Sequence, residues 1–401
     1  RYSYDSADVS SLSGNEIMTI YEDRSGLLWV GTKSRGLNKW NPRTWSYGYE
    51  PAKKITAGAE RQPNVMSFVE DDAGILWVGT FGDGLNAIDR ATGDVVKYRN
   101  DPASLHRIGD DRVMSLMRDS KGRIWVGTMT NGINRIDPRT GENQAFTHDS
   151  EDPTSLSANG IMAMFEDSSA RVWIGTFGGG ISRFDPATEQ FTRFSPDPGN
   201  PASLSSDRVT SFAEDLSGQI WVGTEGGGLN VFNPTTAQFH SFRHGPQDPK
   251  TIASDTVYAI NVDAAGTVWV GTQGGGLDRV VGDVRNPAEI HFANVSEVDG
   301  LSNDVIYGLQ IDDAGWLWMS TNYGINRYNP ASGEIKTMHR KDGLQSEEFN
   351  FSAHYRSPKG EMFFGGHNGF NAFEPEAIQV NKTVPLIALT GYFNSNDPNK
   401  A

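Results

Sequence analysis

Residues 219–230 read Gln-Ile-Trp-Val-Gly-Thr-Glu-Gly-Gly-Gly-Leu-Asn, and this phrase returns along almost the whole chain. Eight copies are recognisable, six of them complete and two shortened, and each has an aromatic residue at the position of Trp221. These aromatic residues are Trp29, Trp77, Trp125, Trp173, Trp221, Trp269, Trp318 and Phe363, spaced by 45–49 residues. A fixed period of this size is typical of solenoids, propellers and other repeat arrays.

The repeat over residues 204–243 predicts four short strands, which we name a, b, c and d. The expected strands are 209–213, 219–224, 229–232 and 239–242. Asp215 and Gly218 suit the a–b turn, because Asp caps backbone groups and Gly accepts a positive φ. Pro234 ends strand c, since proline has no N–H to donate. Short strands at this spacing indicate an all-β fold, and four antiparallel strands per repeat are typical of a β-propeller blade.

The two ends of the chain predict an eight-bladed propeller over residues 1–383. Arg1–Tyr4 reads as an isolated strand d, whereas the eighth copy, residues 351–374, supplies strands a, b and c but is followed by a poor strand d. We therefore expect Arg1–Tyr4 to close the ring, which would leave no unpaired sheet edge where the ends meet. The alternative is a seven-bladed ring that leaves one repeat outside.

Composition excludes several classes of partner. The net charge of −15 and the pI of about 5.0 argue against binding to the nucleic-acid backbone, which needs a basic face. The chain has no cysteine, which removes disulfides and thiolate chemistry. It also has no apolar run long enough to span a bilayer, so we expect no membrane contact by this chain itself. Arg1 looks like the start of a fragment.

The b–c turns vary between repeats, and they are the predicted ligand-binding positions. Strand a starts where strand d ends, so the b–c turns and the d–a connectors should share one face. Aromatic, amide and mixed charged side chains gathered there suit a sugar or a peptide. The candidate residues are Lys33, Arg35, Phe81, Asp83, Met129, Asn131, Phe177, Glu225, Gln273, Asn322, Tyr323, His367 and Asn368. The alternative for each is that it merely packs on the adjacent connector.

Enzyme signatures are missing from the sequence. It has no His-Glu-x-x-His, no Gly-x-Ser-x-Gly and no Walker loop, and its Gly-Gly-Gly turns lead into strands rather than helices. We therefore predict no enzymatic activity, no metal site and no cofactor. One alternative is a lyase or hydrolase for sugars or cyclic peptides, with His367, Glu225 and Arg35 as candidates. Another is a scaffold that binds a protein across the face.

The pattern Ile-x-x-Ile-x-Glu-Asp-x-x-Gly-x-Leu-Trp-Val-Gly-Thr-x-x-Gly-Gly-Leu-Asn-x-x-x-Pro resembles the two-component regulator propeller repeat. The resemblance covers residues 12–375 and is most specific over 17–42 and 209–234. It also implies that residues 384–401 are the first strand of a truncated β-sandwich domain named for three tyrosines, or a linker. Better-known relatives have two seven-bladed propellers. The family has no universal ligand residues, so no binding position is carried over by motif.

The resemblance implies an extracytoplasmic sensor. Relatives are ectodomains of bacterial membrane receptors with histidine kinase, hybrid kinase-regulator or diguanylate cyclase outputs, and many sense oligosaccharides. We therefore expect a periplasmic ligand-sensing domain that binds a small molecule or an oligosaccharide on the b–c face, within a receptor that forms a homodimer.

Overall fold

The computed structural model describes residues 4, 12–24, 26–40, 48–51 and 64–378. The chain divides into two compact units, of which one is Thr44–Ala377 and the other contains the sheet of the first repeat. The predicted domain boundary after residue 383 and the predicted sandwich strand at 384–401 lie outside the described residues.

The chain forms eight antiparallel sheets, so the predicted all-β fold and the count of eight sheets are confirmed. The first sheet has three strands, β1 (Ile17–Glu22), β2 (Leu28–Thr32) and β3 (Gly36–Trp40), and the other seven sheets have four.

The four-stranded sheets follow one another along the chain in the order a to d. The second, third and fourth repeats form β5 (Asn64–Glu70), β6 (Ile75–Phe81), β7 (Leu85–Asp89) and β8 (Val95–Tyr98); β9 (Val113–Arg118), β10 (Ile124–Thr128), β11 (Ile133–Ile136) and β12 (Asn143–Phe146); and β13 (Ile161–Glu166), β14 (Val172–Thr176), β15 (Ile181–Asp185) and β16 (Gln190–Phe194). The fifth, sixth and seventh form β17 (Val209–Glu214), β18 (Ile220–Thr224), β19 (Leu229–Asn233) and β20 (Gln238–Phe242); β21 (Val257–Val262), β22 (Val268–Thr272), β23 (Leu277–Val281) and β24 (His291–Val295); and β25 (Ile306–Ile311), β26 (Leu317–Thr321), β27 (Ile325–Tyr328) and β28 (Ile335–Met338). The eighth forms β29 (His354–Arg356), β30 (Met362–Gly366) and β31 (Gly369–Phe373).

The ring closes at a different strand from the one predicted. Strand β31 pairs with β4 (Tyr49–Pro51), and Phe370 lies opposite Glu50. Arg1–Tyr4 is therefore not the closing strand; residues 1–3 of that segment lie outside the described residues. The strand d of the first repeat therefore completes the sheet of the eighth.

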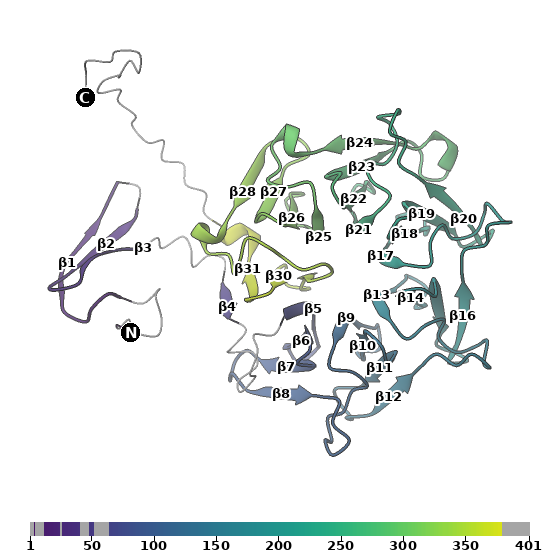
Figure 1. Ribbon diagram of the computed structural model, residues 1–401, viewed down its shortest axis with the longest axis horizontal. Coiled ribbons are helices and arrows are strands. Elements are labelled where there is room, and N and C mark those ends of the chain that lie inside the picture. The colour runs from purple at the N-terminus through teal and green to yellow at the C-terminus, as the bar shows by residue number, and fades with distance from the viewer. Residues whose placement is uncertain (1–3, 5–11, 25, 41–47, 52–63, 379–401) are drawn as a thin grey trace, which may run out of the picture. The chain divides into compact units, whose positions relative to one another are not determined.

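The ring within Thr44–Ala377 consequently contains seven sheets. The inner strands contact one another in the closed order β5, β9, β13, β17, β21, β25, β29 and back to β5. Figure 1 shows β5, β9, β13, β17, β21 and β25 around the centre, with β8, β12, β16, β20, β24 and β28 on the circumference. The prediction of eight thus holds for the number of sheets but not for one ring of eight, and the ring itself follows the seven-bladed alternative.

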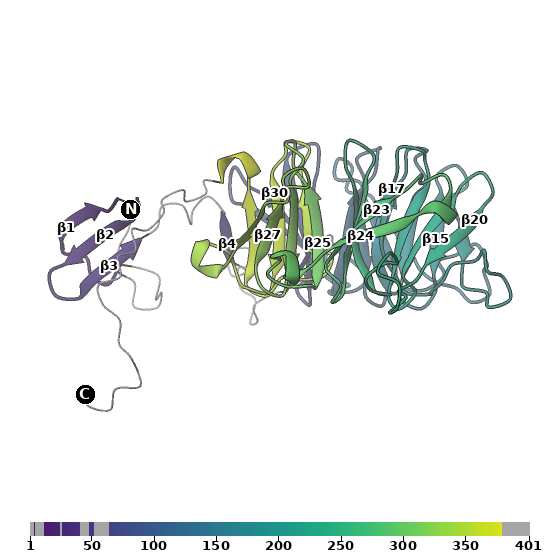
Figure 2. The same cartoon turned by 90° about the horizontal axis from the view of Figure 1, so that it is seen from above.

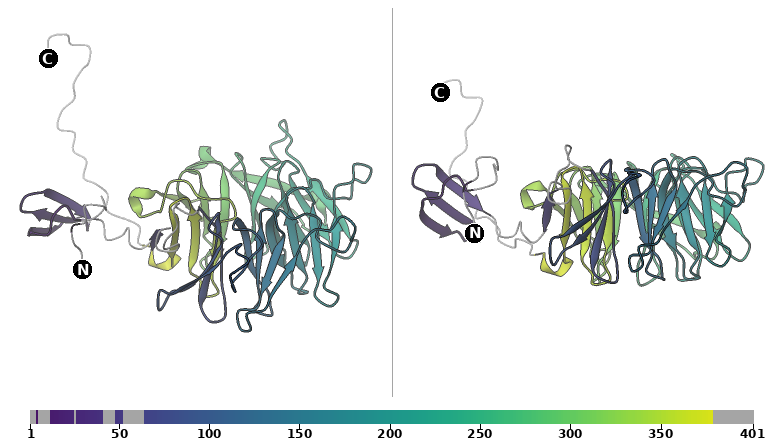
Figure 3. Two further views of the ribbon diagram at one scale, coloured as in Figure 1. Left: turned by 60° about the horizontal axis from the view of Figure 1, so that its bottom comes forward. Right: turned by 90° about the horizontal axis from the view of Figure 1, so that it is seen from below.

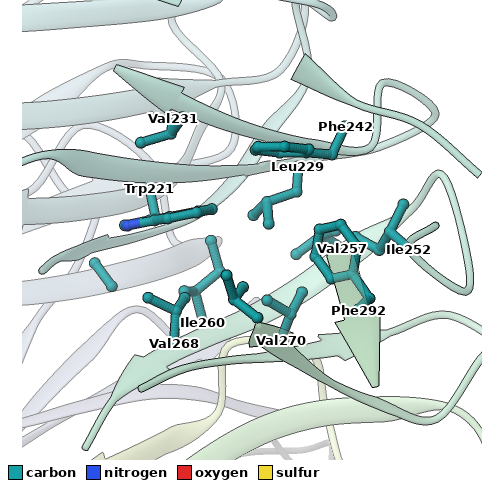
Figure 4. Close-up of a cluster of buried hydrophobic side chains, with 12 residues drawn as sticks. Trp221, Leu229, Val231, Phe242, Ile252, Val257, Ile260, Val268, Val270 and Phe292 are labelled. Atoms are coloured by element: carbon teal, nitrogen blue, oxygen red, sulfur yellow. The ribbon is translucent and has the colours of Figure 1, made fainter. Parts of the chain in front are cut away.

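Buried side chains from neighbouring sheets form the core between blades. Trp221 of β18 packs with Val257 and Ile260 of β21 and with Phe242 of β20 (Figure 4). Its indole Nε1–H donates to Asp215 Oδ2 at 2.8 Å, so the Asp of the a–b turn anchors the Trp as well as capping the turn. The same bond recurs in each repeat from the first to the seventh, and the eighth has Phe363 and Ser357 at the two positions.

Turns and short 3-10 helices lie on both faces of the ring, while the strands run between the faces (Figures 2 and 3). The 3-10 helices are η2 (Pro287–Glu289), η3 (Glu297–Asp299), η4 (Arg340–Asp342) and η5 (Pro375–Ala377). No helix among the described residues has the length and apolar character needed to cross a bilayer.

Candidate ligand pocket at the centre of the ring

The b–c turns and the d–a connectors lie on one face of the ring and are bonded together. The backbone N–H of Gly84 donates to the carbonyl of Asp111 at 2.9 Å, and that of Gly228 donates to Asp255 at 2.7 Å. Each of these bonds joins a b–c turn to the connector that leads into the next blade. The variable turns therefore surround one mouth of the central channel. We call the face that carries the b–c turns and the d–a connectors the b–c face.

A β-bulge recurs near the start of strand a, at its second residue or, in β5, its third. In the sheet of β5 and β6, for example, the pairing shifts between Val65 and Ser67. A bulge re-aims a side chain away from the regular alternation. The residues at this position around the ring are Met66, Met114, Met162, Thr210, Tyr258 and Tyr307.

The eighth repeat lacks the regular start of strand a. Three residues separate Asp304 from Gly308 in the seventh repeat, whereas five separate the corresponding Glu347 and Ala353. The longer segment, residues 348–352, is irregular and includes Ser352 with a φ of +61°. Strand β29 then has only three residues.

Asn350 fastens this segment to the first sheet of the ring. The Nδ2 amide of Asn350 is buried and donates to Asn64 Oδ1 at 2.5 Å and to the Val65 carbonyl at 2.7 Å. The irregular segment is therefore held in place at the join of the ring, and it replaces regular backbone with side chains that face the channel mouth.

A pocket of about 320 Å³ opens between the irregular segment and the bulged residues. Most of its lining is aromatic, thioether or amide. The lining residues are Asn64, Met66, Phe81, Met114, Tyr307, Asn322, Glu348, Phe349, Asn350, Phe351 and His367. Apolar walls with a few placed polar groups are typical of small-molecule sites, although the volume is at the lower end of their range.

Burial raises the pKa of the Tyr307 phenol, and the hydrogen bond with Asn322 opposes that rise. The Glu348 carboxylate adds to the increase through its charge. Burial likewise raises the pKa of Tyr258, whose ring stacks on Tyr307 with centroids 5.5 Å apart. Both phenols therefore keep their protons at neutral pH, and Tyr307, which lines the pocket, can donate a hydrogen bond to a ligand.

The pocket gathers three of the predicted residues, Phe81, Asn322 and His367. They come from the b–c turns of the second, seventh and eighth repeats, which meet where the ring closes. The other ten predicted residues do not line the pocket, and most of them make contacts that hold turns or connectors in place.

Two pairs of contacts show this holding role. Asp83 forms an ion pair with Arg99 at 3.0 Å, and Asn131 Nδ2 donates to the carbonyl of Gly109 at 2.8 Å. Tyr323 packs against His339 with tilted rings whose centroids lie 4.7 Å apart, and Asn368 donates its backbone N–H to Gln345 Oε1 at 3.1 Å.

Arg208, which the sequence analysis missed, links two further predicted residues. Its guanidinium lies 4.5 Å from the centroid of the Phe177 ring and forms an ion pair with Glu225 at 3.0 Å. The pocket lining includes His367 but not Glu225, so these two residues of the enzyme alternative are not brought together there.

Met129 and Gln273 continue the inter-strand pairing beyond their strands. The Met129 N–H donates to the Arg112 carbonyl, and the Gln273 N–H donates to the Thr256 carbonyl, both at 2.9 Å. Neither lines the pocket.

Lys33 and Arg35 lie in the β2–β3 turn of the first sheet, in the other compact unit. Lys33 pairs with Glu16 at 3.0 Å, and the Arg35 guanidinium lies 4.7 Å from the centroid of the Tyr4 ring. No group of three or more potential metal ligands is assembled within the part of the chain that the structure describes.

Four segments of the chain match a described family of repeats. Residues 11–34, 60–82, 107–130 and 251–274 match the family model of the two component regulator propeller. A 77-residue stretch is 30% identical to "Histidine kinase P4" of Formosa agariphila and covers 19% of this chain and 6% of that protein.

Solved structures share the fold. The extracellular domain of a protein described as a hybrid two component system from B. thetaiotaomicron superposes with a TM-score of 0.77 at 24% identity, over 100% of this chain and 51% of that one. The chain thus spans about half the length of that domain. Virginiamycin B lyase from Staphylococcus aureus gives a TM-score of 0.56 at 14% identity, over 77% of this chain and 94% of that one. At these identities the likeness concerns the fold alone.

Proposed function

Because four of its segments match the two component regulator propeller model, we propose that the chain is the ligand-sensing, extracytoplasmic part of a bacterial signal-transduction receptor. The ligand is an oligosaccharide or a similar small polar molecule, and it binds in the central pocket on the b–c face. In the complete receptor, binding passes a signal to a cytoplasmic kinase or cyclase through paired copies of the ectodomain in the periplasm.

The composition of the pocket lining is the observation that carries this proposal. Phe81, Tyr307 and Phe351 offer aromatic faces, while Asn64 and Asn322 offer amide donors and acceptors. Aromatic faces suit the apolar faces of sugar rings, and amides suit the hydroxyls at the ring edges. The rigid ring around the pocket also keeps the cost of ordering these groups on binding low.

A thermal-shift screen of neutral oligosaccharides, with amino acids and short peptides as controls, tests the proposal. A ligand at 100 times its Kd adds about 2.7 kcal/mol to the free energy of unfolding, which is a measurable rise in Tm. Phe81→Ala should abolish the rise for the ligand that is found.

Phe177→Ala is the matched control. Phe177 occupies the same position of its repeat and is 41% exposed, close to the 44% of Phe81, but it does not line the pocket. A ligand whose binding depends on Phe177 and not on Phe81 would place the site elsewhere on the face. Failure of every sugar to shift the Tm would count against an oligosaccharide sensor.

A second candidate is a propeller that binds another protein across the b–c face. Exposed apolar side chains on this face favour it, namely Phe81, Phe177 and Tyr323 on the turns and Val298 on a connector. Its test is a pull-down with the Phe177→Ala and Tyr323→Ala variants. A stable complex that both substitutions weaken, without a small-molecule shift, would favour this candidate over a sensor of small ligands.

A further inference from the structure

We propose that the pocket selects oligosaccharides that carry a free amino group, and that Glu348 is the residue that recognises the ammonium. This inference rests on the proposed function, and it adds the sign of the charge on the ligand and the residue that recognises that charge. It is carried by the distribution of charge and aromatic rings around the pocket.

The pocket has a negative charge and no fixed positive one. Glu348 is its only carboxylate, and neither Lys nor Arg is among the described residues that line it. Two guanidinium groups of the b–c face are already paired, Arg112 with Asp110 at 2.9 Å and Arg208 with Glu225 at 3.0 Å. A polyanionic ligand would therefore meet an unbalanced carboxylate, while a cationic group would be attracted.

Glu348 differs from the glutamate that precedes it. Glu347 accepts a hydrogen bond from the imidazole Nδ1 of His339 at 3.0 Å, so its charge is engaged within the connector. The Glu348 side chain is exposed and makes no hydrogen bond or ion pair with any other described residue. Glu348 lines the pocket together with Tyr307, and its charge helps to raise the pKa of the Tyr307 phenol.

Aromatic rings lie beside this carboxylate. Tyr258 stacks on Tyr307 with centroids 5.5 Å apart and meets Phe351 at 5.0 Å. Tyr307 and Phe351 line the pocket together with Glu348. An ammonium group is attracted to the face of an aromatic ring as well as to a carboxylate, so the cluster offers it both partners.

The test compares oligosaccharides that differ only in charge. Titration calorimetry at pH 6, where an amine of this type is protonated, measures the Kd of glucosamine oligomers, their N-acetylated forms, neutral glucose oligomers and oligogalacturonate of equal length. We expect the glucosamine oligomer to bind about tenfold more tightly than its N-acetylated form. Added salt should reduce that difference.

Glu348→Gln keeps the shape of the side chain and removes its charge. It should weaken the glucosamine oligomer about tenfold and leave the neutral oligomer within about twofold. Glu151→Gln removes the same charge from an exposed connector of another blade and should change neither Kd. Circular dichroism confirms that both variants are folded.

Two other results would overturn the inference in distinguishable ways. Equal binding of amino, N-acetylated and neutral oligomers, unaffected by Glu348→Gln, would remove the selectivity and leave the oligosaccharide sensor standing. Absence of binding by all four ligand types to the folded protein would reject the proposed function together with the inference.

Discussion

The sheet β1–β3 and the sheets of the ring have the same repeat sequence, yet they bury it to different extents. Ile20 of β1 is 64% exposed, whereas Phe68, at the same register of β5, is 3% exposed. Leu37 of β3 is 62% exposed, and its counterpart Leu85 is fully buried. The bonds within the repeat are nevertheless alike: the Trp29 indole donates to Asp23 at 2.8 Å, as Trp221 donates to Asp215.

Each repeat specifies its own strand pairing and its Asp–Trp bond, whereas the neighbouring repeats add the burial of its apolar faces. Strand pairing and the Asp–Trp bond need residues of one repeat only, so they form in both settings. Burial of the apolar faces needs a sheet on each side, which each blade of the ring has. This is the physical reason that a single repeat of such an array cannot form a core by itself.

The largest expected effect comes from removing the shared tryptophan in each setting. Trp221→Ala leaves a cavity between two blades and should reduce the free energy of unfolding by about 3–5 kcal/mol. Trp29→Ala breaks the same bond to an Asp without opening a core between blades, so its effect should be far smaller. Guanidinium unfolding followed by far-UV circular dichroism measures both, and equal losses would contradict the comparison.

A buried histidine, His354, gives a second comparison between the sheets, in which the measured quantity is the pH dependence of stability. Burial of the β29 imidazole within the ring lowers the pKa of His354 to about 4, and its Nδ1 lies 2.8 Å from Gln310 Nε2. The lowered pKa favours the neutral imidazole in the folded state. Its contribution to stability is therefore complete above pH 6.5 and is lost as the pH falls from 6.5 to 4, by about 2–3 kcal/mol.

Ile20→His is the matched variant for this prediction, because Ile20 has the same register in the exposed sheet as His354 in the ring. Its imidazole should titrate near the ordinary value in an NMR pH titration. His354→Leu, which copies Leu309 of the seventh repeat, should remove the loss of stability on the acid side. A histidine signal from His354 that titrates above pH 6 would show that the site is open to water.

The sequence predicted the strands well, because each is bounded by residues with strong local preferences. The expected strands at 209–213 and 229–232 agree with β17 and β19 to within one residue. Ring closure was less predictable, since backbone hydrogen bonds do not distinguish one short strand d from another. Strand β31 accepts Tyr49–Pro51, and no side-chain pattern marks that choice in advance.

The candidate site was only partly predictable for a similar reason. Phe81, Asn322 and His367, which line the pocket, were predicted as candidates because the b–c turns vary between repeats. Two other signals were overlooked: the variable second residue of strand a, as in Tyr307, and the two additional residues before Ala353. Departures from the repeat, rather than the repeat itself, mark the pocket.

Close approach of neighbouring blades gives a smaller effect. A Cβ on Gly223 would lie 2.7 Å from Val257 Cγ1 of the next sheet, so Gly223→Ala should push two blades apart and cost about 1–3 kcal/mol. A Cβ on Gly31 would meet the Thr19 methyl within its own exposed sheet, at 2.7 Å. Gly31→Ala should therefore reduce the free energy of unfolding by less than Gly223→Ala, since Thr19 is free to turn aside. Differential scanning calorimetry of the two variants measures this difference.

The smallest expected effect concerns a carboxylate that replaces an amide. Asp278 occupies the register held by Asn230 and Asn38 in other repeats, and its Oδ2 accepts the Ala253 N–H at 2.8 Å. Burial raises its pKa to about 6, although the bonds from Ala253 and Asn294 and the charge of His244 act in the opposite direction.

The raised pKa means that the folded state favours protonated Asp278, so stability from this group is greatest below pH 4 and falls as the pH rises to 6. The sign is opposite to that of His354, and the two partly cancel between pH 4 and 6 in the unaltered protein. In the His354→Leu background the free energy of unfolding should therefore fall by about 1–2 kcal/mol over that range. Asp278→Asn should flatten the profile. Asn38→Asp places the same carboxyl in the less buried first sheet, where its pKa should stay near 4. A pKa near 6 for this carboxyl would mean that local hydrogen bonds, rather than burial between blades, set the pKa of Asp278.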